Sequence, residues 1–457
     1  MKTLLLYLII STLTIAQSSN FIRAADLSFW EELNENNAKF YHHGNETPLL
    51  NIFSQTGFTH VRLRIWHTPA EGYNDLESTL NTALAAKEAG LKLYLDFHYS
   101  DWWADPGKQD IPSAWVGLEF DTLVDSLYNY TYSVISALQA QNTIPEIVQL
   151  GNEISCGFLW DEARICDDLN TFDQWTKFAA LLNAGKQAIN DALGPENTTK
   201  IMIHTDRGGD NASCRWFFSK LLTYGFDFDI IGLSYYPWWH GELDNLKDNL
   251  DDLTWRYSQD IFIAETAYPF TLANQDGTNN FVWEESQLLE NYPATPAGQK
   301  QYYTDLLTLL ESYSGKVTGV ALWEPAFRGI PGMDSPWENQ LLFDFIGNAL
   351  PSFEVFESYL TSFETQNSTN KKFFISHNYP NPFNSATNFN LFLKEQETLK
   401  ITIWSSLGEC VKSYSEKIYQ SGNHRLEVKI YGFPSGVYFL KIDGSNFSVY
   451  RPIMLLK

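Results

Sequence analysis

The chain has 457 residues, of which 44% are hydrophobic, and this is enough for one large domain with a buried core and a smaller second one. Its 55 acidic and 31 basic residues give a formal net charge of -24. A surface this acidic repels phosphate backbones, so we expect no nucleic-acid partner, whereas a neutral polymer would not be repelled.

Residues 1–16 have the features of a signal peptide. Lys2 supplies a positive charge, and the apolar stretch that follows, from Leu4 to Ala16, is too short to cross a bilayer. Thr14-Ile15-Ala16 offers small residues for cleavage. No later apolar run is long enough for a transmembrane helix, so we expect no transmembrane segment in the mature protein.

Four cysteines are too few for a disulfide-rich scaffold. Cys156 and Cys166 lie ten residues apart in one expected loop and could pair in an oxidising compartment, although two free thiols are equally compatible with the sequence. Cys214 and Cys410 have no evident partner.

From residue 24 to residue 360 one pattern repeats, in which a short apolar strand ends in polar or aromatic residues and a helical stretch follows. The strongest helical patterns are Leu76–Ala89, Phe120–Ala140 and Trp175–Leu193. The expected strands are Ala25–Trp30, His60–Trp66, Lys92–Tyr99, Glu146–Glu153, Lys200–Asp206, Phe228–Tyr236, Asp260–Tyr268 and Val317–Glu324. Eight strand–helix units predict an α/β fold, a (β/α)8 TIM barrel. An open doubly wound sheet is the alternative, and the lack of a glycine-rich fingerprint after the first strand disfavours it.

Two glutamates end apolar strand cores, Glu153 on the fourth expected strand and Glu265 on the seventh. Barrel enzymes carry their catalytic groups at the carboxyl ends of the strands, and strands four and seven face each other across a barrel. Two carboxyl groups about 5–5.5 Å apart are the arrangement of a retaining glycosidase. The pair therefore predicts hydrolysis of a glycosidic bond, a reaction for which we expect no catalytic cofactor.

Gly151-Asn152-Glu153 and Ala264-Glu265 resemble the catalytic strand ends of the large clan of retaining barrel glycosidases. Within that clan the chain is similar to glycoside hydrolase family 53, the arabinogalactan endo-β-1,4-galactanases, over residues 24–360. The strings that carry this resemblance are Ala25-Asp26-Leu27-Ser28, Val61-Arg62-Leu63-Arg64-Ile65-Trp66, Asp96-Phe97-His98-Tyr99-Ser100-Asp101, Trp103-Ala104-Asp105-Pro106, Trp323-Glu324-Pro325-Ala326 and Trp337-Glu338-Asn339-Gln340.

The resemblance implies an endo-acting, retaining enzyme that cleaves β-1,4-galactosidic bonds in the galactan and arabinogalactan side chains of pectin. One alternative is another barrel glycosidase of the clan that acts on mannan, xylan or glucan, since the catalytic pair is shared. A second is a non-catalytic glycan-binding protein at the cell surface. The intact Glu153, Glu265, Asn152 and Arg64 argue against that second alternative.

The resemblance also implies roles for individual residues. Glu153 would be the acid/base and Glu265 the nucleophile, while Asn152 would bond the sugar 2-hydroxyl. Arg64 would bond Glu265 and keep it ionised, whereas Arg62 would lie deeper in a structural ion pair. The other expected substrate-binding residues are His98, Tyr236, Trp323, His204, Asp206, Trp103 and Asp105, with Trp102, Trp238 and Trp239 as further candidates. Some of these residues could instead pack in the fold without contacting a ligand. This alternative applies to His204 and Asp206 on the fifth strand and to the loop residues Trp102, Trp103, Asp105, Trp238 and Trp239.

The loop after Glu265 has oxygen-bearing side chains at alternating positions, namely Asn274, Asp276, Thr278 and Asn280. Bacterial members of the family can hold calcium in this loop, and amide, hydroxyl and carboxylate oxygens suit a structural Ca²⁺. Only one of the four is acidic, which departs from the family pattern. A solvated polar loop is therefore an equal alternative.

After the barrel, residues 361–372 are polar and predict a linker, and residues 373–457 alternate short strands with turns. The expected strands are Ala386–Leu393, Leu399–Trp404, His424–Ile430 and Gly436–Ile442, which predict a small all-β sandwich. A carbohydrate-binding module is one alternative for it. Three strings resemble the sorting domain of the type IX secretion system, namely Asn378-Tyr379-Pro380-Asn381-Pro382-Phe383-Asn384, Ile403-Trp404-Ser405-Ser406-Leu407-Gly408 and Gly436-Val437-Tyr438-Phe439-Leu440. This resemblance implies the type IX machinery as a partner and a protein that is secreted or held at the outer cell surface.

Overall fold

The computed structural model describes residues 21–360 except 71 and 314, and residues 373–456 except 376–377, 379–382, 394, 406–408 and 446–447. The expected signal peptide at 1–16 and linker at 361–372 lie outside the described residues. The chain divides into two compact units, Met1–Tyr359 and Leu360–Lys457.

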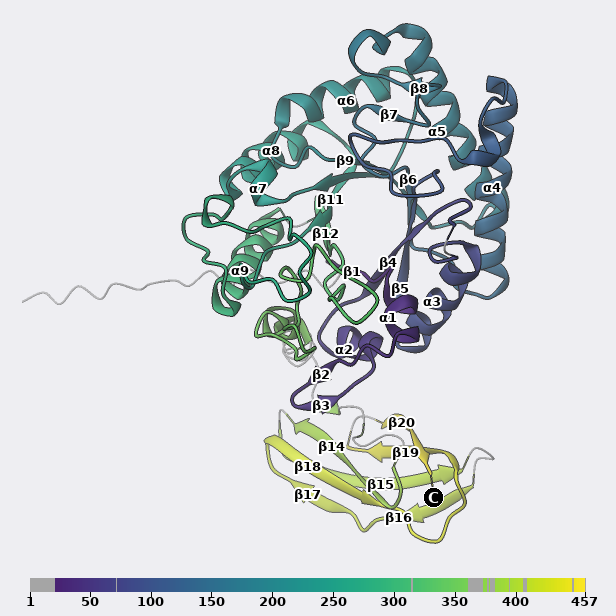
Figure 1. Ribbon diagram of the computed structural model, residues 1–457. Helices are drawn as coiled ribbons and strands as arrows, with labels where there is room; N and C mark the ends of the chain where they lie inside the picture. The colour runs from purple at the N-terminus through teal and green to yellow at the C-terminus, as the bar shows by residue number, and fades with distance from the viewer. Residues whose placement is uncertain are drawn as a thin grey trace, which may run out of the picture. The chain divides into compact units, whose positions relative to one another are not determined.

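The first unit is a closed barrel of parallel strands with helices around it (Figure 1). Around the barrel the strands run β1–β12–β11–β10–β9–β6–β5–β4. Their bounds are β1 Ile22–Asp26, β4 His60–Ile65, β5 Lys92–Phe97, β6 Ile147–Leu150, β9 Lys200–Thr205, β10 Ile230–Ser234, β11 Asp260–Thr266 and β12 Val317–Leu322. The predicted (β/α)8 barrel is confirmed.

The described helices are α1 Trp30–Glu35, α2 Leu49–Gln55, α3 Leu76–Glu88, α4 Phe120–Ala140, α5 Phe172–Leu193, α6 Asn211–Thr223, α7 Pro237–His240, α8 Leu243–Arg256 and α9 Pro296–Ser312. Short hairpins, β2 Tyr41–His42 with β3 Asn45–Glu46 and β7 Gly157–Phe158 with β8 Ala163–Arg164, lie in the connections. Several predicted bounds differ from the observed ones, and two of the differences have a clear local cause. β1 ends at Asp26 because Trp30 already begins α1, and α5 begins three residues early because the Thr171 side chain caps it by accepting from the Gln174 amide.

Side chains fill the barrel interior below the site. This layer consists of Ala24, Tyr94, Ile147, Met202, Ile230, Phe262, Ala264 and Ala321. Glycines on the strands make room for the larger members. A Cβ at Gly319 would lie 2.4 Å from the Phe262 ring, and one at Gly232 would lie 2.6 Å from the Met202 sulfur. The barrel is therefore closed beneath its carboxyl ends, and a ligand can enter only from the loop side.

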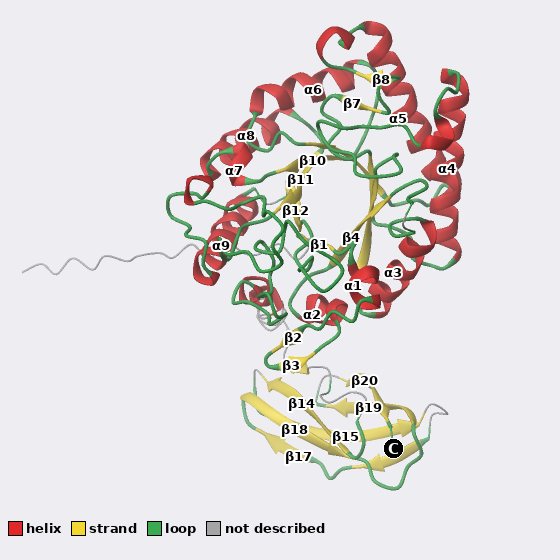
Figure 2. Cartoon of the chain, viewed as in Figure 1, coloured by secondary structure: helices red, strands yellow, loops and turns green. Residues whose placement is uncertain are grey.

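The second unit is all-β, as predicted (Figure 2). One sheet contains β13 Phe373–Ile375, β14 Ala386–Leu393 and β18 Gly422–Lys429; the other contains β15 Glu397–Ser405, β16 Cys410–Ser413, β17 Lys417–Tyr419, β19 Gly436–Asp443 and β20 Ser448–Leu455. Leu391 and Leu426 from the first sheet share one apolar core with Ile403 and Leu440 from the second. The two sheets therefore pack face to face as a sandwich.

No helix in either described unit is both long enough and apolar enough to span a membrane.

A disulfide joins Cys156 to Cys166 in the loop after the fourth barrel strand, so these two cysteines are paired and are not free thiols. Cys214 is a buried free thiol and Cys410 an exposed one.

We expect the disulfide to stabilise the folded protein measurably. The double variant Cys156→Ser/Cys166→Ser should unfold with a free energy lower by roughly 2–3 kcal/mol, because the bond restricts a short loop in the unfolded chain. Denaturant titration measures this difference. A thiol count in denaturant should rise from two to four on reduction, and a count of four before reduction would contradict the pairing.

Candidate active site

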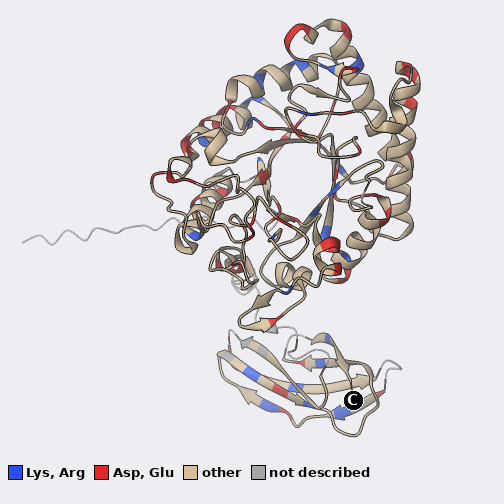
Figure 3. Ribbon diagram, in the orientation of Figure 1, with Lys and Arg blue, Asp and Glu red and all other residues tan. Residues whose placement is uncertain are grey.

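A cavity of about 1070 Å³ opens at the carboxyl ends of the barrel strands, and both glutamates line it. Its aromatic lining consists of Phe29, Trp66, Tyr73, Trp102, Trp103, Tyr236, Trp239, Phe281, Trp323, Phe327 and Trp337, and its polar lining includes Asn74, Asp105, Lys108, Asn152, Glu153, Asp206, Arg207, His240, Glu265 and Asp334. Aromatic walls with a few polar groups suit sugar rings, which have apolar faces and hydroxyl edges. Figure 3 shows that charged residues also lie on the strands inside the ring of helices.

The backbone after β6 turns sharply to present Glu153. Gly151 has a φ of 87°, and a Cβ there would lie 2.6 Å from the Ile154 side chain. Glu153 itself has a φ of 49°, a left-handed conformation that is uncommon for a residue with a side chain. The Ile154 amide donates to the His204 carbonyl at 2.9 Å and anchors the turn. Strain of this kind is typical of functional sites, where the surrounding structure holds it.

Glu265 lies inside β11 at an irregularity of the sheet. Leu233 pairs with Ile263, but the next residue of β10, Ser234, pairs with Glu265, so Ala264 is an extra residue. A bulge of this type re-aims the adjoining side chain and is common beside active sites. It accounts for how a carboxylate within a buried strand reaches the cavity.

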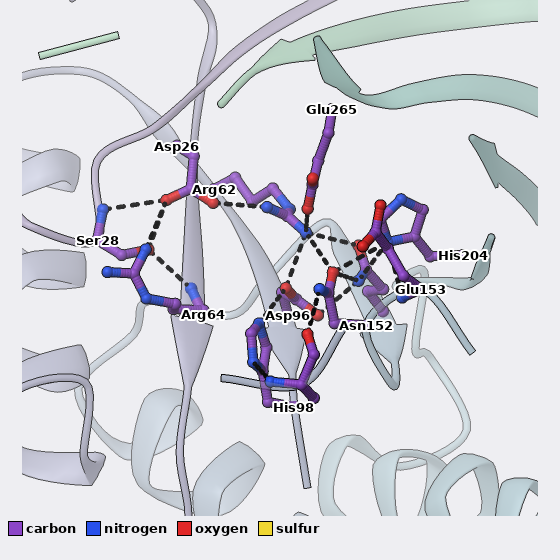
Figure 4. Close-up of polar contacts among 12 residues, drawn as sticks. Asp26, Ser28, Arg62, Arg64, Asp96, His98, Asn152, Glu153, His204 and Glu265 are labelled. Atoms are coloured by element: carbon purple, nitrogen blue, oxygen red, sulfur yellow. Dashed lines mark hydrogen bonds and ion pairs between the residues drawn. The ribbon is translucent and has the colours of Figure 1, made fainter. Parts of the chain in front are cut away.

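A buried arginine holds Glu265 from below (Figure 4). Arg62 Nη2 donates to Glu265 Oε1 at 2.8 Å and to Asp96 at 2.8 Å, while Nη1 donates to Asp26 at 2.6 Å. Arg62 Nη2 also donates to Asn152 Oδ1 at 3.1 Å. One guanidinium therefore fixes the nucleophile candidate and its neighbouring amide, and charge-assisted bonds of this kind are strong and directional.

Glu153 has a different set of partners. Ser234 Oγ donates to Glu153 Oε1 at 2.6 Å, and His204 Nε2 lies 2.9 Å from the same hydroxyl. His204 Nδ1 accepts from the Glu153 amide at 3.3 Å and from the Gln149 side-chain amide at 3.0 Å, so the proton of this ring is on Nε2. Burial lowers the pKa of His204 well below its usual value, and Arg62 lowers it further, so the ring stays neutral.

The two carboxyl groups differ in how easily they ionise. Burial raises the pKa of both. The pKa of Glu153 is raised further by the negative charges of Glu265 and Asp206. For Glu265 the Arg62 cation opposes the effect of burial, the charges of Asp96 and Asp26 add to it, and the hydrogen bond from Tyr236 lowers the pKa. The pKa of Glu265 is raised to about 7, less than that of Glu153, which is raised well above its usual value. The proton of the pair therefore resides on Glu153, and Glu265 is the carboxylate.

Residues 22–356 match the model of glycosyl hydrolase family 53. The chain belongs to glycosyl hydrolase family 53. The arabinogalactan endo-β-1,4-galactanase of Cellvibrio japonicus is 36% identical, over 78% of this chain and 96% of that protein. The protein of the same name from Thermothelomyces thermophilus is 35% identical, over 69% and 92%. Among solved structures, the family 53 catalytic domain of Ignisphaera aggregans is 36% identical with a TM-score of 0.69, over 74% of this chain and 95% of that one.

Residues 377–455 match the secretion system C-terminal sorting domain. This tail indicates that the family 53 enzyme is exported by the type IX system, to the cell surface or out of the cell.

The expected Arg64–Glu265 contact was wrong, because Arg62, which lies in the expected buried ion pair, also contacts Glu265. Arg64 Nη1 donates to Glu324 at 2.5 Å, and its guanidinium carbon lies 4.3 Å from the Phe29 ring centroid and 4.2 Å from that of Trp103. Both side chains leave the same strand face, but the deeper one, Arg62, reaches across the barrel to β11. Arg64 instead stiffens the aromatic wall of the cavity through cation–π contacts.

Two predicted histidines are fully buried and do not line the cavity. His98 Nε2 contacts Asp96 at 3.2 Å, and its Nδ1 accepts from Trp66 Nε1 at 3.2 Å and from the Ala104 amide at 3.1 Å. It contacts neither glutamate and does not line the cavity, so the expected contact with substrate is not seen. His204 likewise lies behind Glu153 rather than beside a sugar, since the fifth strand sends its ring toward β10. Both act on the site through other side chains.

The other predicted residues come together in the cavity. Its lining contains Asn152, Asp206, Tyr236, Trp323, Trp103, Asp105, Trp102 and Trp239. Trp238 is not in that lining and packs on Tyr236 and Trp337 instead. Three further residues of the site were not predicted from the sequence. Ser234 donates to Glu153, Asp96 accepts from Arg62, and Gln149 donates to Asn152.

The loop 274–280 is closed by its own hydrogen bonds. The Gly277 amide donates to Asn274 Oδ1 at 2.7 Å, and the two Asp276 carboxylate oxygens accept from the Thr278 and Ser335 amides at 2.7 and 2.6 Å. The Asn280 amide group donates to the Ala273 carbonyl. These bonds use several of the candidate oxygens, whereas Asn280 Oδ1 is buried without a hydrogen-bond partner, so the calcium site stays a prediction.

We expect Tyr236→Phe to shift the pH profile of activity. Tyr236 Oη donates to Glu265 Oε2 at 2.9 Å, which stabilises the ionised carboxylate. Its loss raises the pKa of Glu265, and because the reaction needs this group ionised, the acidic limb of kcat/KM should move upward by about one pH unit. The alkaline limb should move less. A pH–rate profile measures both limbs, and an unchanged acidic limb would contradict the assignment.

Proposed function

We propose that this protein cleaves β-1,4-galactan by a retaining mechanism, with Glu153 as acid/base and Glu265 as nucleophile. The chain is a glycoside hydrolase, an endo-β-1,4-galactanase, as family membership and its galactanase relatives establish. The observation that carries the proposed roles is the unequal setting of the two carboxyl groups. Arg62 and Tyr236 stabilise the anion of Glu265, whereas the side chain of Glu153 accepts from the neutral Ser234 hydroxyl.

In the first step Glu265 attacks the anomeric carbon while Glu153 gives its proton to the glycosidic oxygen. The bond to the leaving galactan chain breaks and an ester bond to Glu265 forms. In the second step the Glu153 carboxylate takes a proton from water, whose oxygen attacks the same carbon and displaces Glu265. Two inversions retain the β configuration, and both carboxyl groups return to their starting states without a cofactor.

The remaining residues would hold the substrate and the catalytic pair in position. Asn152, fixed by Arg62 and by its own bond to the Ala104 carbonyl at 2.9 Å, offers its side chain to the sugar 2-hydroxyl. Trp323 would form the floor beneath the ring, with its backbone carbonyl bonded to Trp337 Nε1 at 3.1 Å. Trp103 and Asp105 also line the cavity and would contact further sugar units of a longer chain.

The substrate is tested with a panel of linear polysaccharides. We expect reducing ends and short galactooligosaccharides from β-1,4-galactan, the side chain of pectin, and little release from mannan, xylan or β-glucan. A rapid fall in viscosity would show endo action. Activity on mannan without activity on galactan would reverse the substrate assignment, and binding without hydrolysis would favour a glycan-binding protein.

We also propose a domain order for the precursor: a signal peptide at 1–16, the catalytic barrel at 24–360, a linker at 361–372 and the sorting sandwich at 373–457. The type IX export machinery would be the partner of the last part. Mass spectrometry of the exported protein tests these boundaries. A released protein that retains both the signal peptide and the sorting sandwich would contradict them.

A further inference from the structure

His42, His43 and Glu357 form a cluster outside the catalytic cavity. One ring nitrogen of each histidine and one carboxylate oxygen all lie within 4.8 Å of one another. His42 Nε2 is 3.1 Å from Glu357 Oε1, and the two imidazole rings lie against each other at a tilt of 39°, with centroids 3.9 Å apart. None of the three lines the cavity that holds Glu153 and Glu265. The proposed glycosidase chemistry does not account for this cluster.

The backbone explains why two consecutive histidines face the same partner. Adjacent residues of a strand point to opposite sides of the sheet. Here His43 and Gly44 connect β2 to β3 with φ values of 49° and 78°, the two positive values of a tight hairpin turn. Asparagine or aspartate is the usual first residue of such a turn. With His43 in the left-handed region, its ring lies against that of His42 instead of pointing away.

The hairpin is fixed to the last part of the barrel unit. The Tyr41 amide donates to the Gly347 carbonyl at 2.8 Å, and the Ala349 amide donates to the Tyr41 carbonyl at 2.9 Å. The His42 ring packs edge-on against Phe353. Glu357 follows in the helical segment 353–360. The three side chains therefore come from backbone that is already held in place.

We propose that His42, His43 and Glu357 bind a zinc ion. Two imidazole nitrogens and one carboxylate oxygen are a known zinc donor set, with water as the fourth ligand. In a tetrahedron with zinc–ligand bonds of 2.0–2.1 Å the ligand atoms lie about 3.3 Å apart. The His42–Glu357 distance of 3.1 Å already fits, and His43, which is exposed, is free to rotate toward the ion. The imidazoles favour zinc over calcium or magnesium, which prefer all-oxygen sites.

The ion has a structural role in this proposal. It links residue 42 to residue 357, near the two ends of the barrel unit, and a link that closes so long a loop restricts the unfolded chain. Binding only to the folded form also stabilises it by mass action. Zinc should therefore raise the Tm of the barrel and leave turnover of galactan unchanged.

The test uses the mature chain without a histidine tag, in a Cys410→Ser background that removes the exposed thiol, after dialysis against EDTA. Calorimetric titration with Zn²⁺ should give one ion per chain, and thermal unfolding should show a higher Tm with zinc. Co²⁺ should give the visible absorption of a tetrahedral site. His43→Ala and Glu357→Gln should lose both binding and the Tm shift, while circular dichroism and galactan hydrolysis stay as in the parent.

Glu46→Gln is the matched control, since Glu46 is an exposed carboxylate on the same hairpin that pairs with Lys39 at 2.8 Å. It should bind zinc as the parent does. The proposal is overturned if the parent binds no zinc, or if either ligand variant binds it as tightly as the Glu46→Gln control does.

Discussion

Replacing Glu265 with glutamine should lower kcat on linear β-1,4-galactan on the order of 10⁴-fold or more. The amide is nearly isosteric and keeps hydrogen bonds near Arg62 and Tyr236, but it cannot form the ester to the sugar. KM should change little, because the cavity walls are untouched. Reducing-sugar release and the yield of short oligosaccharides over hours measure the loss.

The change also removes a buried negative charge beside Arg62, so folding has to be checked separately. Glu311→Gln is a suitable control, since Glu311 is also a buried carboxyl whose pKa burial raises, but it lies on α9 outside the cavity lining. This variant should hydrolyse galactan at the parent rate. Near-parent turnover in Glu265→Gln, with contaminating activity excluded, would remove Glu265 from the mechanism.

The sequence predicted the barrel, and it placed the two glutamates of the proposed catalytic pair in one cavity, because both predictions depend on local signals. Each barrel strand is a run of apolar residues ended by polar ones, and Glu153 and Glu265 stand at such ends. The bulge at Ala264 could not be predicted, since it is defined by pairing with β10 and β12. The cap at Thr171 is visible in the sequence, but the predicted helix began at Trp175, its first buried residue, whereas Phe172 at the true start is exposed.

The contacts that tune the pair depend on neighbours that are remote in sequence. Arg62 and Arg64 are equivalent by strand periodicity, and only the positions of Asp26, Asp96 and Glu324 decide which one meets Glu265. Ser234 can bridge His204 and Glu153 only because β10 pairs with β9, which places its hydroxyl beside the His204 ring. In the tail, β13, β16, β17 and β20 were not predicted, because short or edge strands have weak alternation.

Replacing Glu153 with alanine should separate the two steps of the reaction. On galactan the leaving sugar needs a proton, so kcat/KM should fall by about 10²–10⁴-fold. An aryl β-galactobioside with an acidic phenol as leaving group needs no such proton, so its first step should stay near the parent rate. The second step lacks its base, so the ester on Glu265 should accumulate, with a burst of phenol and a mass increase on the peptide that contains Glu265.

Azide distinguishes the roles of the two carboxyl groups, because it is an anionic nucleophile that needs no base. It should restore turnover of the aryl substrate by Glu153→Ala and yield a β-galactosyl azide, since it attacks the ester from the face that water uses. In a Glu265→Ala variant azide would take the place of the nucleophile itself, and the product would have the α configuration. Equal losses of Glu153→Ala on both substrates, with no response to azide, would show that Glu153 is not the acid/base. The α product from Glu153→Ala would instead exchange the two assignments, although burial and the Glu265 charge both favour the protonated form of Glu153.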